Sequence, residues 1–336
     1  MSLPRAYGGS TLTAQFRASP EDFLVVEQPA FEASGAGEHL LLTIEKRGLT
    51  TVMAAKRLAA WAGVPEADVG YAGMKDRNAV TRQRFTVRIP KKVAPDVGAL
   101  ATGDFRVLDA HWHLRKLPRG ALAGNMFELM LRDVSGEAAT IDARLAAIAS
   151  GGLPNYFGEQ RFGRSGDNVE QARRMFAGAR MRREERSLLL SAARSELFNA
   201  VLAARVDEGT WATGMDGEVW MLEGTHSVFG PEGATQELRE RAARGDIHAT
   251  GPMWGRGALR TTGACAALEA RVLEPHADLR VGLEKEGLRQ ERRALRVRVG
   301  ELAWERPSAD TLKLRFALPP GSYATGLLAE LGEVAA

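Results

Sequence analysis

The chain has 336 residues, of which 45% are hydrophobic and 26% are charged. This composition is typical of a folded globular protein, and the length is sufficient for two domains. The net charge is only +3, so charge alone is weak evidence for a nucleic-acid partner. The apolar runs are too short to span a membrane, and the N-terminus lacks the pattern of a secretory signal. We therefore expect a cytoplasmic protein.

In the first 150 residues, strand patterns outnumber helical patterns. Two helices are predicted, at residues 50–62 and 141–148, the first with an apolar face formed by Val52, Ala55, Leu58, Ala59 and Ala62. The strands are mostly adjacent along the chain, which favours an α+β fold over a repeated βαβ fold. They are predicted at residues 12–17, 23–27, 39–45, 81–89, 105–114 and 125–132.

A Gly-Gly-Leu-Pro break at residues 151–154 marks a candidate domain boundary. The chain after it is rich in arginine, with nine Arg against four acids between residues 161 and 194. Such a segment suits phosphate contacts, although a solvated helix face is the commoner explanation. Helices are predicted at residues 168–177, 188–206 and 322–331, and strands at 295–299 and 311–318. We expect an inserted domain between two parts of one core.

Several common chemistries lack their sequence signals. The chain has no GxxxxGK[ST] loop, no GxGxxG after a strand, no HExxH and no CxxC. His111 and His113 share a strand face but have no third candidate ligand nearby in the sequence. The single cysteine, Cys265, lies among alanines, so we expect a buried, inert thiol. We therefore expect neither a cofactor nor a metal.

The most informative stretch is YAGMKDRNAVTRQRF, which begins at Tyr71. It places one carboxylate, Asp76, between Lys75 and Arg77, after a glycine and before a strand with a basic face. One interpretation is a surface turn with an Asp–Arg pair. The other is a reactive carboxylate in a pocket for a polyanion, because cationic neighbours favour its ionised form.

This stretch resembles the signature of the TruD family of tRNA pseudouridine synthases. Five further stretches also resemble motifs of that family, and together with this one they occur along the chain in the family's order. They are SPEDFLVVE (19–27), GNMF (124–127), PNYFGEQRFG (154–163), SAARSELFN (191–199) and LPPGSYAT (318–325). The resemblance implies a pseudouridine synthase core with a mainly antiparallel sheet. This core comprises residues 1–150 and 291–336, and an inserted α/β domain comprises residues 151–290. The implied substrate is uridine at position 13 of tRNA.

The resemblance also implies roles for individual residues. Asp76 corresponds to the catalytic nucleophile, and Arg17 to a basic residue that pairs with it. Phe127 corresponds to an aromatic residue that stacks on the target base, and on sequence alone a core role is about equally plausible. Asn125 is expected to bond the uracil edge or to close a turn. Lys75 and Arg161 are expected to contact substrate, Arg161 within a stretch suited to single-stranded RNA.

The sequence leaves the chemistry partly open. The carboxylate could attack the sugar, stabilise positive charge that develops there, or take a proton from the sugar on a route through a glycal. A non-catalytic RNA-binding or tRNA-chaperone protein on the same scaffold is an alternative. An RNA glycosidase that releases free uracil is another.

Overall fold

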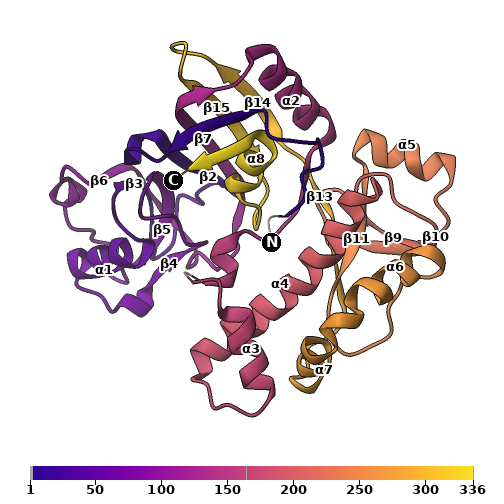
Figure 1. The fold of residues 1–336 in the computed structure, drawn as a ribbon. Coiled ribbons are helices and arrows are strands. Elements are labelled where there is room, and N and C mark those ends of the chain that lie inside the picture. The colour runs from indigo at the N-terminus through magenta and orange to yellow at the C-terminus, as the bar shows by residue number, and fades with distance from the viewer. Residues whose placement is uncertain (1–2, 164, 336) are drawn as a thin grey trace. The chain divides into compact units, whose positions relative to one another are not determined.

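The computed structural model describes residues 3–163 and 165–335, so Arg164 of the arginine-rich segment lies outside the described residues. The chain divides into two units (Figure 1). Unit 1 contains the segment up to Gly9, Ala146–Arg298 and Ser322–Glu330. Unit 2 contains Ser10–Leu145, Val299–Gly321 and the segment from Leu331 onward. The expected domain limits at residues 151 and 290 stay a prediction.

Unit 2 is built on one large sheet. Its strands in the described part of the chain are β1 (Leu12–Phe16), β2 (Phe23–Pro29), β3 (His39–Arg47), β4 (Val69–Tyr71), β5 (Val80–Arg88), β6 (Phe105–His113), β7 (Leu122–Ser135), β14 (Gly300–Glu305), β15 (Leu312–Leu318) and β16 (Gly332–Ala335). The main order is β14-β15-β7-β2-β5-β3-β6, with β1 on β7 and β16, and β4 on β5. Only β1–β16 and β2–β5 pair in parallel among these described strands. The prediction of an α+β fold with a mainly antiparallel sheet is confirmed.

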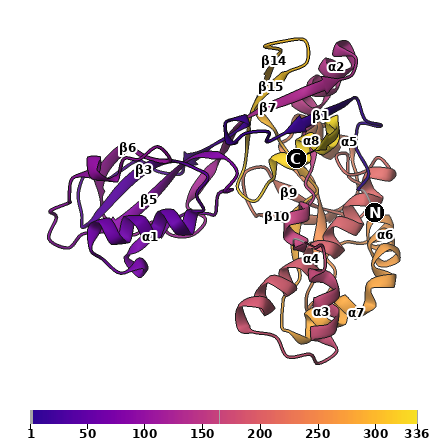
Figure 2. The same ribbon diagram turned by 60° about the vertical axis from the view of Figure 1, so that its left-hand side comes forward.

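Helix α1 (Thr51–Ala62) covers one face of this sheet (Figure 2). The Thr50 side chain accepts a hydrogen bond from the Met53 backbone N–H and so caps the first turn. Gly63 ends the helix in the left-handed conformation, at φ 64°. The buried face of α1 packs against Leu42 and Phe85 of the neighbouring strands. The helix predicted at residues 50–62 is therefore present, with Thr50 as its cap. Of its predicted apolar face, Ala55, Leu58 and Ala59 are buried, whereas Val52 is 38% exposed.

Strand β5 shows the predicted alternation. Thr81, Gln83 and Phe85 are buried on one face, whereas Arg82 and Arg84 on the other face are partly exposed. The buried face is not fully apolar, because a threonine and a glutamine lie within it. These two polar residues lie close to the loop that carries Asp76, and Gln83 helps to hold that loop.

Unit 1 is more helical. Its helices are α3 (Asn168–Phe176), α4 (Arg183–Asp207), α5 (Gln236–Arg244), α6 (Gly263–Leu273), α7 (Ala277–Lys285) and α8 (Ala324–Leu331), and α2 (Ala138–Gly151) leads into it from unit 2. Its strands form a sheet in the order β10 (Val228–Glu232), β9 (Glu218–Leu222), β11 (Ile247–Met253) and β12 (Glu291–Ala294), and a pair, β8 (Leu153–Pro154) with β13 (Arg296–Val297). Short 3-10 turns occur in both units. Those of unit 2 are Pro20–Asp22, Glu66–Asp68 and Val97–Leu100, and those of unit 1 are Glu159–Phe162 and Glu274–His276.

The long helix α4 supplies the centre of unit 1. One stripe of it, with Leu189, Ala193, Leu197 and Val201, packs with residues of α3, α6 and α7. Phe198 on its other side belongs to a second cluster against β9 and β11. Apolar residues at helical spacing on two sides explain why α4 is buried along its second half. No helix within the described ranges is long and apolar enough to cross a membrane.

Candidate active site around Asp76

Asp76 lies in the loop between β4 and β5 of unit 2. Its Oδ2 atom is 2.9 Å from Nη2 of Arg17, and its Oδ1 atom accepts a hydrogen bond of 2.9 Å from the backbone N–H of Asn78. The side chains of Asp76 and Arg17 are 34% and 24% exposed. The predicted pair is thus present. It orients the carboxylate without covering it, which leaves an anionic oxygen accessible to a substrate.

Arg17 is itself held in an unusual conformation. Its φ is 65°, in the left-handed region that side chains other than glycine rarely adopt. Its guanidinium lies 4.6 Å from the ring centre of Phe23 and 4.9 Å from that of Phe16. Strain of this kind costs about 1–3 kcal/mol and persists where the surroundings enforce it. Here the two rings and Asp76 together fix the guanidinium.

The loop before Asp76 is fastened by a buried ion pair. Nζ of Lys75 is 2.8 Å from Oε2 of Glu27 on β2, and the two side chains are only 6% and 1% exposed. Breaking such a pair from one side leaves a buried charge uncompensated, so the pair strongly favours one loop position. The structure therefore shows Lys75 as an anchor of the loop, and its contact with substrate stays a prediction.

Three uncharged contacts add to this anchor. The backbone N–H of Lys75 donates to Oγ1 of Thr51 at 2.9 Å, and Oγ1 of Thr51 is 3.1 Å from Oε1 of Gln83. Nε2 of Gln83 donates to the carbonyl of Gly73 at 2.6 Å. The loop is thus tied to the first turn of α1 and to the buried face of β5.

Lys46 lies beneath the same loop. Its ammonium donates to the carbonyls of Leu49, at 2.5 Å, and of Asp76, at 3.4 Å. Burial lowers the pKa of Lys46 to about 8, with a further lowering by Lys75 and an opposing effect of Asp76. Sequence reasoning did not single out Lys46, Thr51, Gln83 or Glu27. For Glu27 a signal existed, since a carboxylate that ends the apolar run Phe23–Val26 needs a buried partner.

Phe127 on β7 is buried and only 6% exposed. Its ring stacks on Phe23 at 6.2 Å between centroids and on Phe316 of β15 at 5.3 Å. In this structure its faces contact other protein rings, as the core interpretation expects, and its contact with a base stays a prediction. Because Phe23 also lies under Arg17, the aromatic row connects Phe127 to the Asp76 pair.

Asn125 is two residues before Phe127 on β7, opposite Glu27 of β2. Its Oδ1 atom is buried and has no hydrogen-bond partner among the residues that the structure describes. A buried carbonyl oxygen without a donor is costly. The predicted bond from Asn125 to the uracil edge stays a prediction.

Arg161 belongs to unit 1, and its surroundings are also built from the quoted motifs. Its guanidinium donates to Oγ of Ser191 at 2.9 Å and to the hydroxyl of Tyr323 at 3.1 Å. The guanidinium carbon lies 5.4 Å from the ring centre of Phe157. Ser191 and Phe157 also line a cavity of about 260 Å³, together with Ser187, Leu190, Arg194, Ser195, Met253 and Leu288. Arg161 is thus partly committed to protein contacts.

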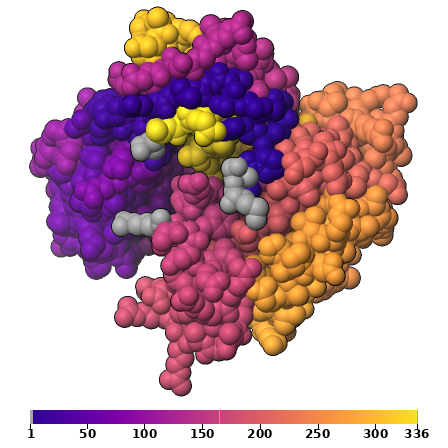
Figure 3. All heavy atoms as spheres, in the orientation of Figure 1, coloured from indigo at the N-terminus to yellow at the C-terminus, as the bar shows by residue number. Residues whose placement is uncertain are grey.

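The arginine-rich segment divides into paired and unpaired side chains. Arg173, Arg174 and Arg186 form ion pairs with Asp278, Glu170 and Glu286. Arg180, Arg182 and Arg183 are exposed and have no side-chain ion pair within residues 3–163 and 165–335. This segment around α3 and the start of α4, rose-coloured in Figure 3, projects long side chains at the lower end of unit 1. The three unpaired arginines are available to phosphates.

Across the described ranges, no group of three or more His, Cys, Asp or Glu side chains is placed to hold a metal ion. Fold and site together define the class of the protein. It is an α+β protein whose candidate site is one accessible, arginine-paired carboxylate on a firmly anchored loop.

Comparisons with known proteins identify the family. The chain matches the family described as tRNA pseudouridine synthase D (TruD) over residues 6–172 and 165–331. It is 57% identical to the tRNA pseudouridine synthase D of Xanthomonas campestris pv. campestris (strain 8004), over 99% of this chain and 95% of the relative. It is 46% identical to the protein of that name from Methylococcus capsulatus, over 98% and 94%.

A solved structure has the same fold. It is a crystal structure of a Methanosarcina mazei protein named as a candidate tRNA pseudouridine synthase D, with a TM-score of 0.77 and 19% identity over 99% of this chain and 96% of that one. The chain therefore belongs to the tRNA pseudouridine synthase D (TruD) family, a family of isomerases.

Proposed function

We propose that this chain isomerises uridine to pseudouridine in tRNA, at position 13, with Asp76 as the nucleophile. The observation that carries the proposal is the Asp76 carboxylate, paired with Arg17 at 2.9 Å yet still accessible. It lies in the stretch that resembles the family's signature. Position 13 is the site that the family resemblance implies.

On the nucleophilic route that we propose, a group of the enzyme bonds to the sugar and leaves again. An oxygen of Asp76 attacks ribose C1′, and the C1′–N1 bond breaks, so that the uracil departs as an anion. The uracil turns, C5 attacks C1′, and the Asp76 carboxylate leaves with its electron pair. The proton on C5 then passes to N1. Atoms and electrons balance without an oxidant, a reductant or an energy source, so we propose that no cofactor is needed.

Two residues of β7 support recognition of uracil. The unpartnered Oδ1 atom of Asn125 matches the N3–H donor of the base. Phe127 is two residues further on the same strand face, and in the proposal its ring contacts the base once the base has left the RNA stack. Arg161 and the exposed arginines near the start of α4 supply positive charge for the RNA backbone.

The test is direct. Purified protein, dialysed against a chelator and returned to Mg²⁺ for tRNA folding, is incubated with unmodified tRNA, and pseudouridine is mapped along the product. We expect pseudouridine at position 13 and none in a tRNA with cytidine there. Release of free uracil, or modification only at other positions, would contradict the proposal.

A further inference from the structure

A second cavity lies in unit 1, whereas Asp76 belongs to unit 2. Its volume is about 430 Å³, in the range of ligand-binding pockets. It is formed by β10, by the loop between β11 and α6, and by the start of β12. The residues that matter for its chemistry are His226, Val228, Leu259, Arg260, Gln290, Glu291 and Arg292.

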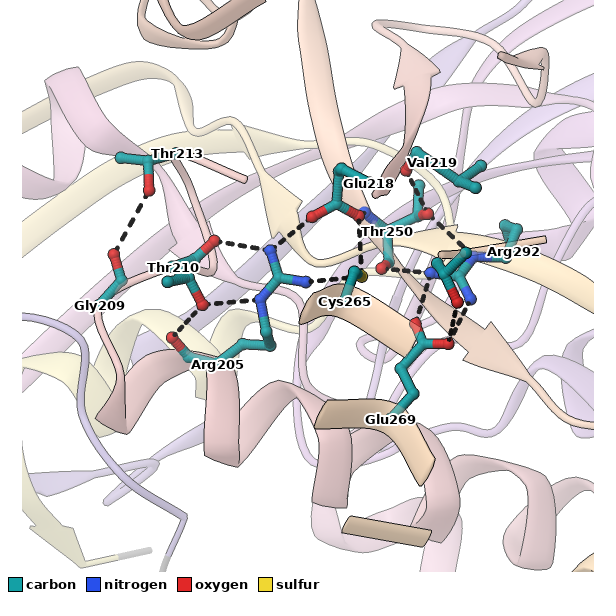
Figure 4. Close-up of polar contacts among 11 residues, drawn as sticks. Arg205, Gly209, Thr210, Thr213, Glu218, Val219, Thr250, Cys265, Glu269 and Arg292 are labelled. Carbon is teal, nitrogen blue, oxygen red and sulfur yellow. Dashed lines mark hydrogen bonds and ion pairs between the residues drawn. The ribbon is translucent and has the colours of Figure 1, made fainter. Parts of the chain in front are cut away.

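The inner wall of this cavity is held by a buried ionic network (Figure 4). The guanidinium of Arg292 donates to both carboxylate oxygens of Glu269, at 2.7 and 3.1 Å, and to Oγ1 and the carbonyl of Thr250, at 2.9 and 2.6 Å. Its donors are thus used within the protein. Thr261 donates to Glu269 at 2.9 Å, which ties the loop beside Arg260 to the same carboxylate.

A second fully buried ion pair continues the network. Nη2 of Arg205 is 2.6 Å from Oε2 of Glu218, whose other oxygen accepts from the backbone N–H of Thr250 at 3.2 Å. Replacing one partner of such a network leaves a buried charge, so the arrangement has little freedom. The cavity wall is therefore preformed, which lowers the entropy cost of binding a ligand.

Of the remaining polar side chains of the cavity, the Glu291 carboxylate is compensated by an ion pair of 3.1 Å with Arg194. Nε2 of Gln290 is buried and donates to no residue that the structure describes. Arg260 and His226 are exposed at the rim, and no ion pair is found for either within the described ranges. Val228 and Leu259 add apolar surface. A matching ligand has a carbonyl acceptor, a negative charge and a flat apolar face.

A nucleotide has all three features. We propose that this cavity binds one unstacked nucleotide of the RNA substrate, with Gln290 donating to a carbonyl of the base and Arg260 contacting a phosphate. Sequence-specific RNA recognition commonly uses single bases that have left the stack and insert between apolar and amide side chains. The inference rests on the proposed function, because it takes the RNA to be the tRNA that the enzyme modifies.

The experiment measures binding rather than turnover. Affinity for unmodified tRNA is determined at several salt concentrations for Gln290→Met, Gln290→Glu and Arg260→Ala, each in the Asp76→Asn protein. Gln236→Met and Arg239→Ala on α5 are matched exposed controls. The same proteins are titrated with uridine 5′-monophosphate by NMR, and melting temperatures check their fold.

We expect Gln290→Met to weaken tRNA binding about five- to tenfold, as the loss of one hydrogen bond does, and Gln290→Glu to weaken it more. Arg260→Ala should reduce the salt slope by about one. The controls should stay within about twofold of the parent protein. Shifts caused by the mononucleotide should be lost in the Gln290 variants.

Two results would overturn the inference. If all three cavity variants bind tRNA like the parent protein, no substrate nucleotide occupies the cavity. If only mononucleotide binding is lost, the cavity takes a free nucleotide instead. Because pseudouridine formation is not measured here, failure of the catalytic proposal would be seen separately, in the mapping experiment.

Discussion

At the scale of single residues, substitutions of Phe127 can distinguish a packing role from a role in catalysis. Phe127→Ala should lower the free energy of unfolding by about 3–5 kcal/mol, because the buried ring stacks on two others. If the ring also contacts the flipped uracil, Phe127→Leu should slow single-turnover pseudouridine formation by about tenfold or more. Denaturant unfolding and rapid-quench assays measure the two effects.

Phe316→Leu is the matched control, since it removes the ring that stacks on the other face of Phe127. Under the proposal it costs similar stability and leaves the rate of the chemical step near that of the parent enzyme. Equal slowing by both substitutions would assign Phe127 a packing role only.

Residue-level prediction from the sequence succeeded where a motif marks the position. Asp76 and Arg17 were expected to pair and do so. Lys46 and Glu27 were missed because their importance depends on strand register, which brings β2, β3 and β5 beneath one loop. Cys265 was expected to be buried, and burial indeed raises the pKa of its thiol to about 12.

At the scale of elements, the start of α4 should bind RNA without taking part in chemistry. Arg182→Ala with Arg183→Ala should weaken tRNA binding and lower its salt slope by about two, because each exposed arginine neutralises one phosphate. The rate at saturating tRNA should be unchanged. Paired Arg173→Ala is the control, and an unaltered salt slope in the double variant would place the RNA elsewhere.

The edge formed by β3 and β6 should make stability depend on pH. His39 and His113 are opposite each other in the register, both are buried, and burial lowers the pKa of each. The unfolded chain therefore binds protons below about pH 6.5 while the folded protein resists them, so stability falls as pH falls below that value.

Replacing the pair with His39→Leu and His113→Phe should flatten this dependence. Each histidine contributes at most about 1.4 kcal/mol per pH unit to the slope of the unfolding free energy. Urea unfolding between pH 5 and 7 measures it, with exposed His226→Ala as the control. An unchanged slope in the double variant would show that other groups cause the acid sensitivity.

Elements were predicted well where the pattern is periodic and poorly where it is not. Seven strands of unit 2, namely β1, β2, β3, β5, β6, β7 and β15, were found within three residues, several of them through alternating buried and exposed positions. The short strands β4, β14 and β16 were not predicted. Between residues 207 and 290 no element was assigned. There β9 is buried at four successive positions and shows no alternation, and α5, α6 and α7 have only 9, 11 and 9 residues.

At the scale of the whole molecule, the net charge is small, but the charged residues are unevenly distributed along the chain. A net charge of +3 hides a segment with nine arginines, of which three are exposed without ion pairs among the described residues. Asp76, the proposed nucleophile, belongs to unit 2 and these arginines belong to unit 1. We therefore assign contacts with the RNA backbone and the chemical step to different parts of the chain. Substitution of these arginines should weaken tRNA binding, and substitution of Asp76 should stop the reaction, each without the other effect.

The most direct test of the account is Asp76→Asn, measured for both properties in one preparation. The substitution keeps the size of the side chain but removes its charge and nucleophilicity, while phosphate contacts elsewhere supply most of the affinity. We expect no pseudouridine in a single-turnover assay at saturating tRNA, and a dissociation constant for tRNA within about threefold of the parent protein. Pseudouridine formation by a pure Asp76→Asn preparation would contradict the assignment of Asp76 as the nucleophile.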